Sequence, residues 1–203
     1  HAVRANMEWN PYQDEYNVTN GSTPIKMFKV GHDFTGTITQ SPSVIKGNGT
    51  LAWDQAKFYS QEQLFGPQKS TAKKANLQIY AADSSRMAFE TSDINGTMDF
   101  SKRIGTFTKN EPGSMTKFDY NMYQTNLTDY RWDMDKKIIT AKVGPSLAGQ
   151  TPIFASTNPT QGGLSFEAKR ADYSLVDYTL KISEIPYIDI ADSRLFLKDG
   201  KAT

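Results

Sequence analysis

The sequence predicts an all-β protein in which stacked short strands form a β-jellyroll or a solenoid-like repeat, as a single elongated body with one loop-rich interruption. Composition is the first reason, since the 203 residues include 10 Tyr and 11 Phe, and helix-forming runs of Leu, Ala and Glu are missing. Aromatic residues suit half-buried pleated surfaces. The second reason is short apolar–polar alternation, and the third is a strand–turn–strand unit that recurs along the chain.

The recurring unit is clearest between residues 92 and 142, where it occurs twice. An apolar alternation ends near an acidic residue, crosses a charged turn and resumes as a second alternation, which is typical of a β-hairpin. The first copy has Ile94, Met98 and Phe100 on one face and a turn at 101–103, and the second has Tyr130, Trp132 and Met134 with a turn at 135–137.

A third copy lies at 44–60, where Asn48-Gly49-Thr50 precedes Leu51 and Trp53, and Asp54-Gln55 make the turn. Asn95-Gly96-Thr97 stands at the same place in the next copy, 47 residues later. The following spacings are shorter and irregular, so no fixed period holds. The alternative is that ordinary β-hairpins resemble one another to this extent.

The chain divides by composition into four stretches. Residues 1–24 form a polar arm or an edge strand, and 25–143 form a β-repeat region. Residues 144–163 form a connection rich in Pro, Gly, Ser and Thr, in which Ile153 and Phe154 suggest packing on the body. A second β-repeat region occupies 164–203. Within the first region, the polar stretch 61–75 with its Gly-Pro break predicts a loop.

Charge and composition exclude several classes of partner. The net charge is +1 with Lys and Arg scattered among the acids, so no basic face for nucleic acid is expected. There is no cysteine, which excludes disulfides and thiolate metal sites. No run of 18 apolar residues occurs, so this sequence is not expected to span a membrane.

No catalytic residue, metal site or cofactor is predicted, and we expect the protein not to be an enzyme. His32 is the one histidine other than His1, and it follows Gly31 in a predicted turn with no convergent partner. The pairs Asp133/Asp135 and Asp189/Asp192 suit turns better than a hard cation, because Ca²⁺ takes six or more oxygens.

Five Asn-x-Ser/Thr sequons permit two interpretations. They mark glycan sites in a eukaryotic secreted chain, or, where Asn-Gly occurs, they form turns, which the lack of cysteine favours. The sequons begin at Asn17, Asn20, Asn48, Asn95 and Asn126.

The segment 164–183, LSFEAKRADYSLVDYTLKIS, resembles the strand units of OstA-like proteins of the lipopolysaccharide-transport group, with Ala168, Ala171 and Tyr173 at the recurring small and aromatic positions. The rhythm over about residues 44 to 197 is also similar to that of large Bacteroidetes cell-envelope proteins built from many repeats. This resemblance implies stacked strands around an apolar interior that carries acyl chains, and a cell-envelope location, periplasmic or associated with the outer membrane.

The expected function is therefore that of a non-enzymatic β-repeat segment, either a scaffold or an apolar groove for an amphipathic ligand such as lipid or lipopolysaccharide. The residues expected to face one continuous interior and contact the ligand are Met98, Phe100, Tyr130, Trp132 and Phe166. The alternative is a β-sandwich carbohydrate-binding or adhesion module, in which exposed tyrosines and Trp9 or Trp53 form a coplanar row.

The stretch 188–197 is expected to be a strand covered on both faces, since Leu195, Phe196 and Leu197 are all apolar. Asp199-Gly200 then predicts a turn toward a further strand. Its free edge is expected to pair with downstream sequence, with a neighbouring molecule or with the arm 1–24.

Overall fold

The described residues of the structure, a computed structural model, are 4–28, 31–83 and 86–203. They form 20 strands and four short 3-10 turns, with no α-helix among them, so the all-β prediction is confirmed. Eighteen strands make one antiparallel sheet, and the other two pair only with each other.

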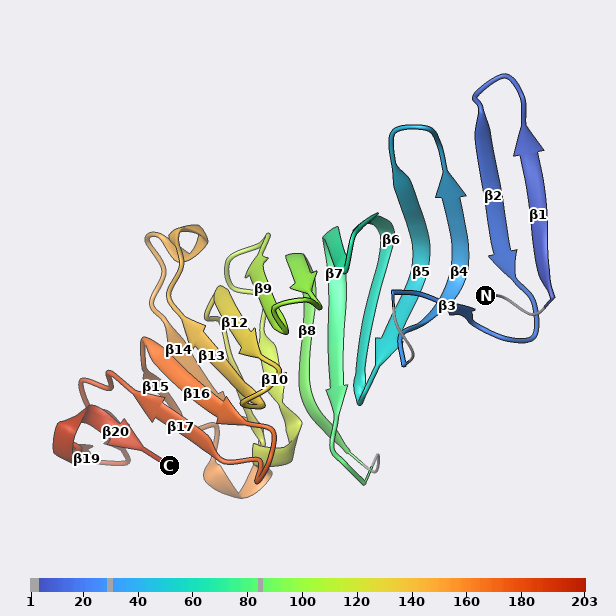
Figure 1. Ribbon diagram of the computed structural model, residues 1–203. Coiled ribbons are helices and arrows are strands. Elements are labelled where there is room, and N and C mark those ends of the chain that lie inside the picture. The colour runs from blue at the N-terminus through green and yellow to red at the C-terminus, as the bar shows by residue number, and fades with distance from the viewer. Residues whose placement is uncertain (1–3, 29–30, 84–85) are drawn as a thin grey trace.

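The first half of the sheet is a meander of long hairpins, in which β4 to β8 each pair with the next strand (Figure 1). Its free edge is the hairpin β1–β2, which extends beyond the rest of the body. These strands are β1 (Ala5–Asn10), β2 (Glu15–Asn20), β3 (Ile25–Lys26), β4 (Asp33–Gln40), β5 (Ile45–Trp53), β6 (Ala56–Gly66), β7 (Lys69–Tyr80), β8 (Met87–Asp99) and β9 (Ile104–Lys109).

Beyond β8 the sheet divides into two branches. One runs β9–β12–β13–β16–β17–β20, and the other runs β10–β11–β14–β15. The strands concerned are β10 (Thr116–Phe118), β11 (Tyr123–Thr125), β12 (Asp129–Asp133), β13 (Ile138–Lys142), β14 (Ile153–Ser156), β15 (Ser165–Glu167), β16 (Arg170–Ser174), β17 (Leu180–Ser183) and β20 (Lys201–Ala202). The separate hairpin is β18 (Ile188–Ile190) with β19 (Ser193–Leu195), and the 3-10 turns are η1 (Asp119–Asn121), η2 (Pro145–Leu147), η3 (Pro159–Gln161) and η4 (Lys198–Gly200).

The division is built into β8 itself. Its later half, from Ile94, pairs with β9, whereas Glu90 in its earlier half pairs with β10. The ladder with β7 shifts register between these halves, and Asp93 there has a φ of 51°. The Asn76 amide oxygen accepts the Asp93 backbone N–H at 3.3 Å. A bulge bends a strand and strengthens its twist, so a single strand enters both branches.

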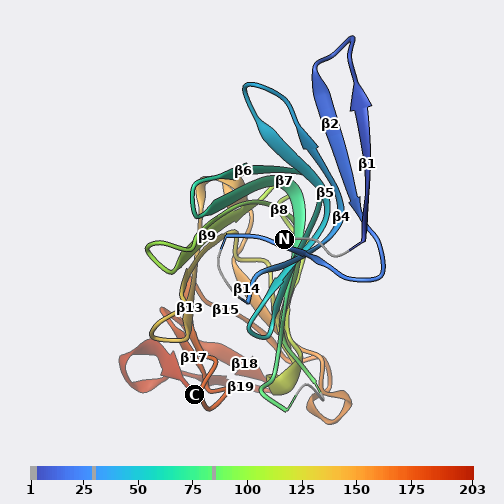
Figure 2. The same cartoon turned by 45° about the vertical axis from the view of Figure 1, so that its right-hand side comes forward.

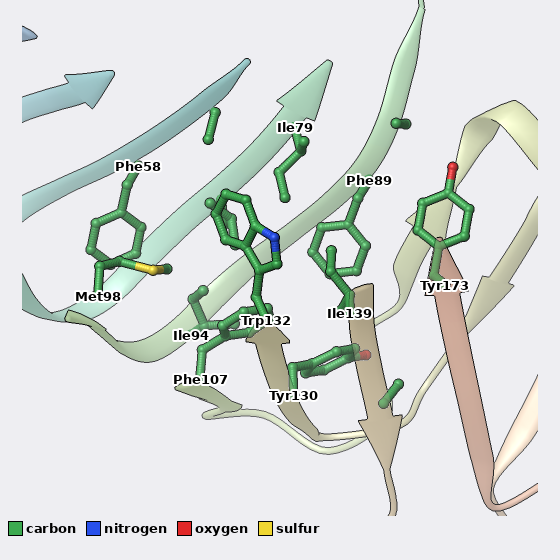
Figure 3. Packing of buried hydrophobic residues seen from close by; sticks show 14 of the residues in the cluster. Phe58, Ile79, Phe89, Ile94, Met98, Phe107, Tyr130, Trp132, Ile139 and Tyr173 are labelled. Atoms are coloured by element: carbon green, nitrogen blue, oxygen red, sulfur yellow. The ribbon is translucent and has the colours of Figure 1, made fainter. Parts of the chain in front are cut away.

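The two branches face each other and enclose the core. Phe118 of β10 packs edge-on against Tyr173 of β16, with 5.1 Å between ring centroids, and Phe89 of β8 packs against Tyr130 of β12 at 5.9 Å. Figure 3 shows side chains from β6, β8, β9, β12 and β16 meeting in this interior. Figure 2 shows the curvature of the sheet that brings these strands around it.

Glycines on the inner face allow aromatic rings to lie against the backbone. A Cβ on Gly96 would meet the Phe58 ring at 3.1 Å. Gly36 and Gly49 face each other across β4 and β5, and a Cβ on Gly49 would lie 2.1 Å from the Thr35 carbonyl oxygen. Glycine is the residue that permits such close approach in a bent sheet.

The predicted loop at 61–75 is wrong, since 61–66 and 69–75 belong to the long strands β6 and β7, and a two-residue turn at 67–68, at the Gly-Pro break, joins them. The alternation was hidden because small and polar residues occupy the buried face. Gln63 and Ser70 are fully buried, and Gln63 Nε2 donates to the Gly49 carbonyl at 2.7 Å. Ser70 Oγ donates to Gln63 Oε1 at 3.2 Å, so the burial leaves these groups hydrogen-bonded.

The interpretation of both Asn-Gly-Thr sequences as turns is also wrong. Asn48 lies inside β5 and Asn95 inside β8, with their side chains on the outer face. The intervening glycines face the rings of the core, which is why Asn-Gly occurs in mid-strand. The turns predicted at 54–55, 101–103 and 135–137 are confirmed.

Both ends of the chain differ from expectation. Residues 5–20 of the N-terminal arm form the edge hairpin β1–β2, which pairs with β4, so the alternative that the arm pairs with 188–197 is wrong. The stretch 188–197 is a short hairpin instead of one strand, and its Leu195 and Phe196 are exposed. The bidentate ion pair of Arg194 with Asp189 crosses this hairpin. The connection 144–163 packs on the body through the fully buried Phe154.

Gly49→Ala should lower the free energy of unfolding by about 2–3 kcal/mol, because its methyl group has no room between β4 and β5. The control is Gly66→Ala in β6, where a Cβ would meet nothing within 4 Å. Thermal and urea unfolding measure both variants, and equal stability of the two would contradict the close packing at Gly49.

Candidate functional site

The five residues predicted to contact a ligand all lie in the same hydrophobic cluster. Each is at most 8% exposed, and they come from β8, the turn after it, β12 and β15. Met98, Phe100 and Tyr130 are absent from the lining of both cavities described below. Trp132 and Phe166 each line one of these two cavities, at the edge of the hydrophobic core. Contact of these five with a ligand stays a prediction.

An apolar cavity of about 310 Å³, here called the apolar groove, opens where the two branches end near the C-terminus. Phe166 of β15 faces Leu180 and Ile182 of β17 across it, and Ile188 and Ile190 of the hairpin β18–β19 close one side. The remaining lining residues are Asn121, Tyr123, Leu164, Ala202 and Thr203. An apolar cleft with few polar groups suits a ligand that is itself largely apolar.

A second cavity, here called the rim cavity, has a volume of about 340 Å³. Hairpin turns of the β9–β17 branch face the β5–β6 turn and the end of β7 across it. It is lined by Asp54, Gln55, Ala56, Ile79, Tyr80, Ala82, Arg103, Trp132, Met134, Lys137, Leu175 and Tyr178.

A broad polar hollow of about 470 Å³ covers the outer face of β12, β13, β16 and β17. Asp172 lies in it and accepts hydrogen bonds from Thr140 Oγ1 at 2.6 Å and from Arg170. Partial burial opposes ionisation of Asp172, but these hydrogen bonds outweigh it and hold the pKa of the carboxyl below its usual value. Both carboxylates of the hollow have a cationic partner, Asp133 with Lys136 and Asp172 with Arg170, as on an ordinary solvated sheet face.

Lys109 is a buried cation at the point where the branches part. It ends β9, is 1% exposed, and its Nζ donates only to Thr116 Oγ1, at 3.4 Å, among the described residues. Burial lowers the pKa of Lys109 to about 8, against the opposing attraction of Asp93. Thr116 Oγ1 also lies 2.8 Å from the hydroxyl of Tyr130, which donates to the Leu127 carbonyl at 2.6 Å.

The aromatic residues named for the carbohydrate alternative separate into two groups. Trp53 is buried and stacks on Trp132, with centroids 5.8 Å apart. Trp9 is 58% exposed and stacks on Tyr16, which is 39% exposed, at 6.1 Å with an interplanar angle of 16°. An exposed, nearly coplanar pair therefore exists, on the hairpin β1–β2.

The residues considered for catalysis or metal binding pack against aromatic rings or pair with neighbouring charges. His32 packs edge-on against Phe100, with 4.5 Å between centroids. Asp133 pairs with Lys136 at 3.6 Å, and Asp189 pairs with Arg194. Nowhere in residues 4–28, 31–83 or 86–203 do three His, Asp or Glu side chains gather as a metal site requires.

Comparison with protein-family models, curated proteins and solved structures finds no match. The part of the chain that the structure covers contains no helix long and apolar enough to cross a membrane.

Lys109→Met should stabilise the protein at pH 7 by about 3 kcal/mol, the equivalent of the pKa difference between 10.5 and about 8. Between these pH values the unfolded chain binds the proton that folded Lys109 has lost, so wild-type stability rises with pH. The advantage of the variant should therefore shrink as the pH rises from 8 to 10.5. Urea unfolding across this range measures it.

The control is Lys102→Met, which removes an exposed charge from the β8–β9 turn. A gain for Lys109→Met that is independent of pH would contradict the cost assigned to burying the cation.

Proposed function

We propose that this chain is a non-enzymatic β-repeat segment of a bacterial cell-envelope protein, and that its apolar groove holds the acyl part of an amphipathic ligand such as lipid or lipopolysaccharide. The observation that carries the proposal is the groove itself. Elsewhere the two branches are in direct contact, as at Phe118 and Tyr173, whereas here apolar side chains of both branches line an open space. The OstA-like rhythm of the strands supports the same ligand class.

The energetic argument is that of any open apolar cleft. Removing apolar surface from water yields about 25 cal/mol per Å². An acyl chain in the groove gains free energy mainly by removing its own surface from water and by covering Ile190, which is 46% exposed. Lys201 and Ser183 lie at the adjacent β17–β20 pair, where a polar head group remains in water. Such a site binds and needs no reacting group, in keeping with a carrier or scaffold.

Ile190→Asp should weaken binding of a dansyl-labelled fatty acid by at least about tenfold, because it places a carboxylate in the apolar groove. Leu195→Asp is the matched control, since Leu195 is 44% exposed and Ile190 46%, and only Ile190 lines the groove. Fluorescence titration measures both. Equal binding by the two variants and the wild type would place the ligand elsewhere or remove this function.

The alternative function, binding of a glycan by aromatic stacking, is favoured by one observation, the Trp9–Tyr16 pair. Flat, exposed rings held parallel by a strand pair form a platform for a sugar ring.

Under this alternative, Trp9→Ala should abolish glycan-array signals that the wild type gives. Tyr12→Ala is the control, because Tyr12 is 97% exposed at the tip of the same hairpin and has no stacking partner in the described ranges. Signals that survive Trp9→Ala would rule the platform out.

A further inference from the structure

Three hairpin loops in the β9–β17 branch have a similar construction. Two have four residues, Phe100–Arg103 between β8 and β9 and Met134–Lys137 between β12 and β13, and the third has five, Leu175–Thr179 between β16 and β17. The first residue of each loop packs on the core. The fourth has a left-handed backbone, with φ of 52° at Arg103, 54° at Lys137 and 56° at Tyr178.

The loops are joined to one another by backbone hydrogen bonds at these fourth residues. The Arg103 carbonyl accepts the Met134 N–H at 3.0 Å, and the Lys137 carbonyl accepts the Leu175 N–H at 2.8 Å. The series begins one hairpin earlier, because the carbonyl of Gln68, with φ of 53°, accepts the Phe100 N–H at 2.8 Å. Arg103, Lys137 and Tyr178 therefore follow one another along the same rim.

Left-handed positions at the end of hairpin loops are where glycine is normally found, because a side chain there costs about 1 kcal/mol or more. None of the three loops has a glycine. Asp54, in the two-residue β5–β6 turn, is a fourth such position, with φ of 47°. Other non-glycine residues, among them Gln68 and Lys74, also have positive φ, so the backbone conformation alone does not mark a site. What these four positions share is where their side chains lie.

All four of these side chains line the rim cavity. Asp54 comes from one side of it, and Arg103, Lys137 and Tyr178 come from the other. Between them the cavity has an aromatic and apolar lining that includes Tyr80, Trp132 and Met134. Rings beside fixed polar groups are the usual make-up of a small-molecule site.

The polar groups of the cavity are mostly hydrogen-bond donors. Arg103 Nε donates to Asp135, and a terminal guanidinium nitrogen lies 3.9 Å from Asp54, which holds the fork in place. Lys137 has no ion pair within the described ranges. The buried indole N–H of Trp132 has no acceptor there either. Arg103 is thus paired with two carboxylates, and Lys137 is the cation of the cavity that the described residues leave without one. A cation without a partner beside aromatic rings favours a ligand that carries a negative charge.

We propose that the rim cavity binds one acidic sugar residue of a glycan, with its carboxylate on Arg103 and Lys137 and its ring against the aromatic lining at Tyr178 and Trp132. A guanidinium fork matches a carboxylate in two parallel hydrogen bonds. A sugar ring presents the C–H face that aromatic side chains contact. This site shares no lining residue with the apolar groove, so it stands apart from the function proposed for that groove.

The test replaces the left-handed residues by glycine. Glycine adopts positive φ without strain, so the substitution removes the side chain and keeps the loop backbone. Lys137→Gly and Arg103→Gly should each weaken binding of a galacturonate oligosaccharide by about tenfold or more, measured by calorimetry. Their Tm should be unchanged or higher by up to about 4 °C, since the left-handed strain is relieved. Lys137→Arg should retain binding because it keeps the charge.

The matched control is Gln68→Gly, which has the same backbone conformation and the same hydrogen-bond role but does not line the cavity. It should bind the galacturonate oligosaccharide as the wild type does. The proposal is overturned if Gln68→Gly loses binding equally, if the two glycine variants at the cavity keep it, or if the wild type prefers inorganic phosphate or a neutral galactose oligosaccharide.

Discussion

The bend of β8 at Asp93 is the constraint on which the rest of the structure depends. Because the strand changes register with β7 there, its two halves start two branches of the sheet, and the core is the space between these branches. An open sheet of this size would otherwise expose one apolar face to water. Because of the bulge, one sheet covers its own apolar face and no second sheet is needed. The rings of Phe89 and Tyr130 meet between the two branches.

Several features near this bend and at the rim cavity lower the stability of the folded protein. Lys109 is buried where the branches part, and the loops at Arg103, Lys137 and Tyr178 keep side chains on left-handed backbone. A protein selected only for stability would replace these features, because each costs of the order of 1–3 kcal/mol. Arg103, Lys137 and Tyr178 line the rim cavity, which is consistent with a stability cost carried for binding there, whereas Lys109 lies at the end of β9 outside this cavity.

The sequence was sufficient for the fold class and for the hairpins whose buried face is apolar, such as those around Met98 and Trp132. It failed where a buried face is small or polar, as at Gln63 and Ser70, and where glycine lies under a ring, as at Gly49. Pairing between strands far apart in the chain, which creates both cavities, leaves no local pattern. Only the recurrence of an aromatic or apolar residue followed by a charged turn indicated the loops that line the rim cavity.

Native-state hydrogen exchange in low urea tests most directly whether the two branches share one core. Amides of β12 and β13 and those of β10 and β14 should exchange with the same free energy and the same urea dependence, because neither branch keeps its apolar face covered without the other. Amides of β1, which lie outside the core, should exchange at lower free energy. Separate free energies for the two branches would show two independent units and would contradict a single core divided at β8.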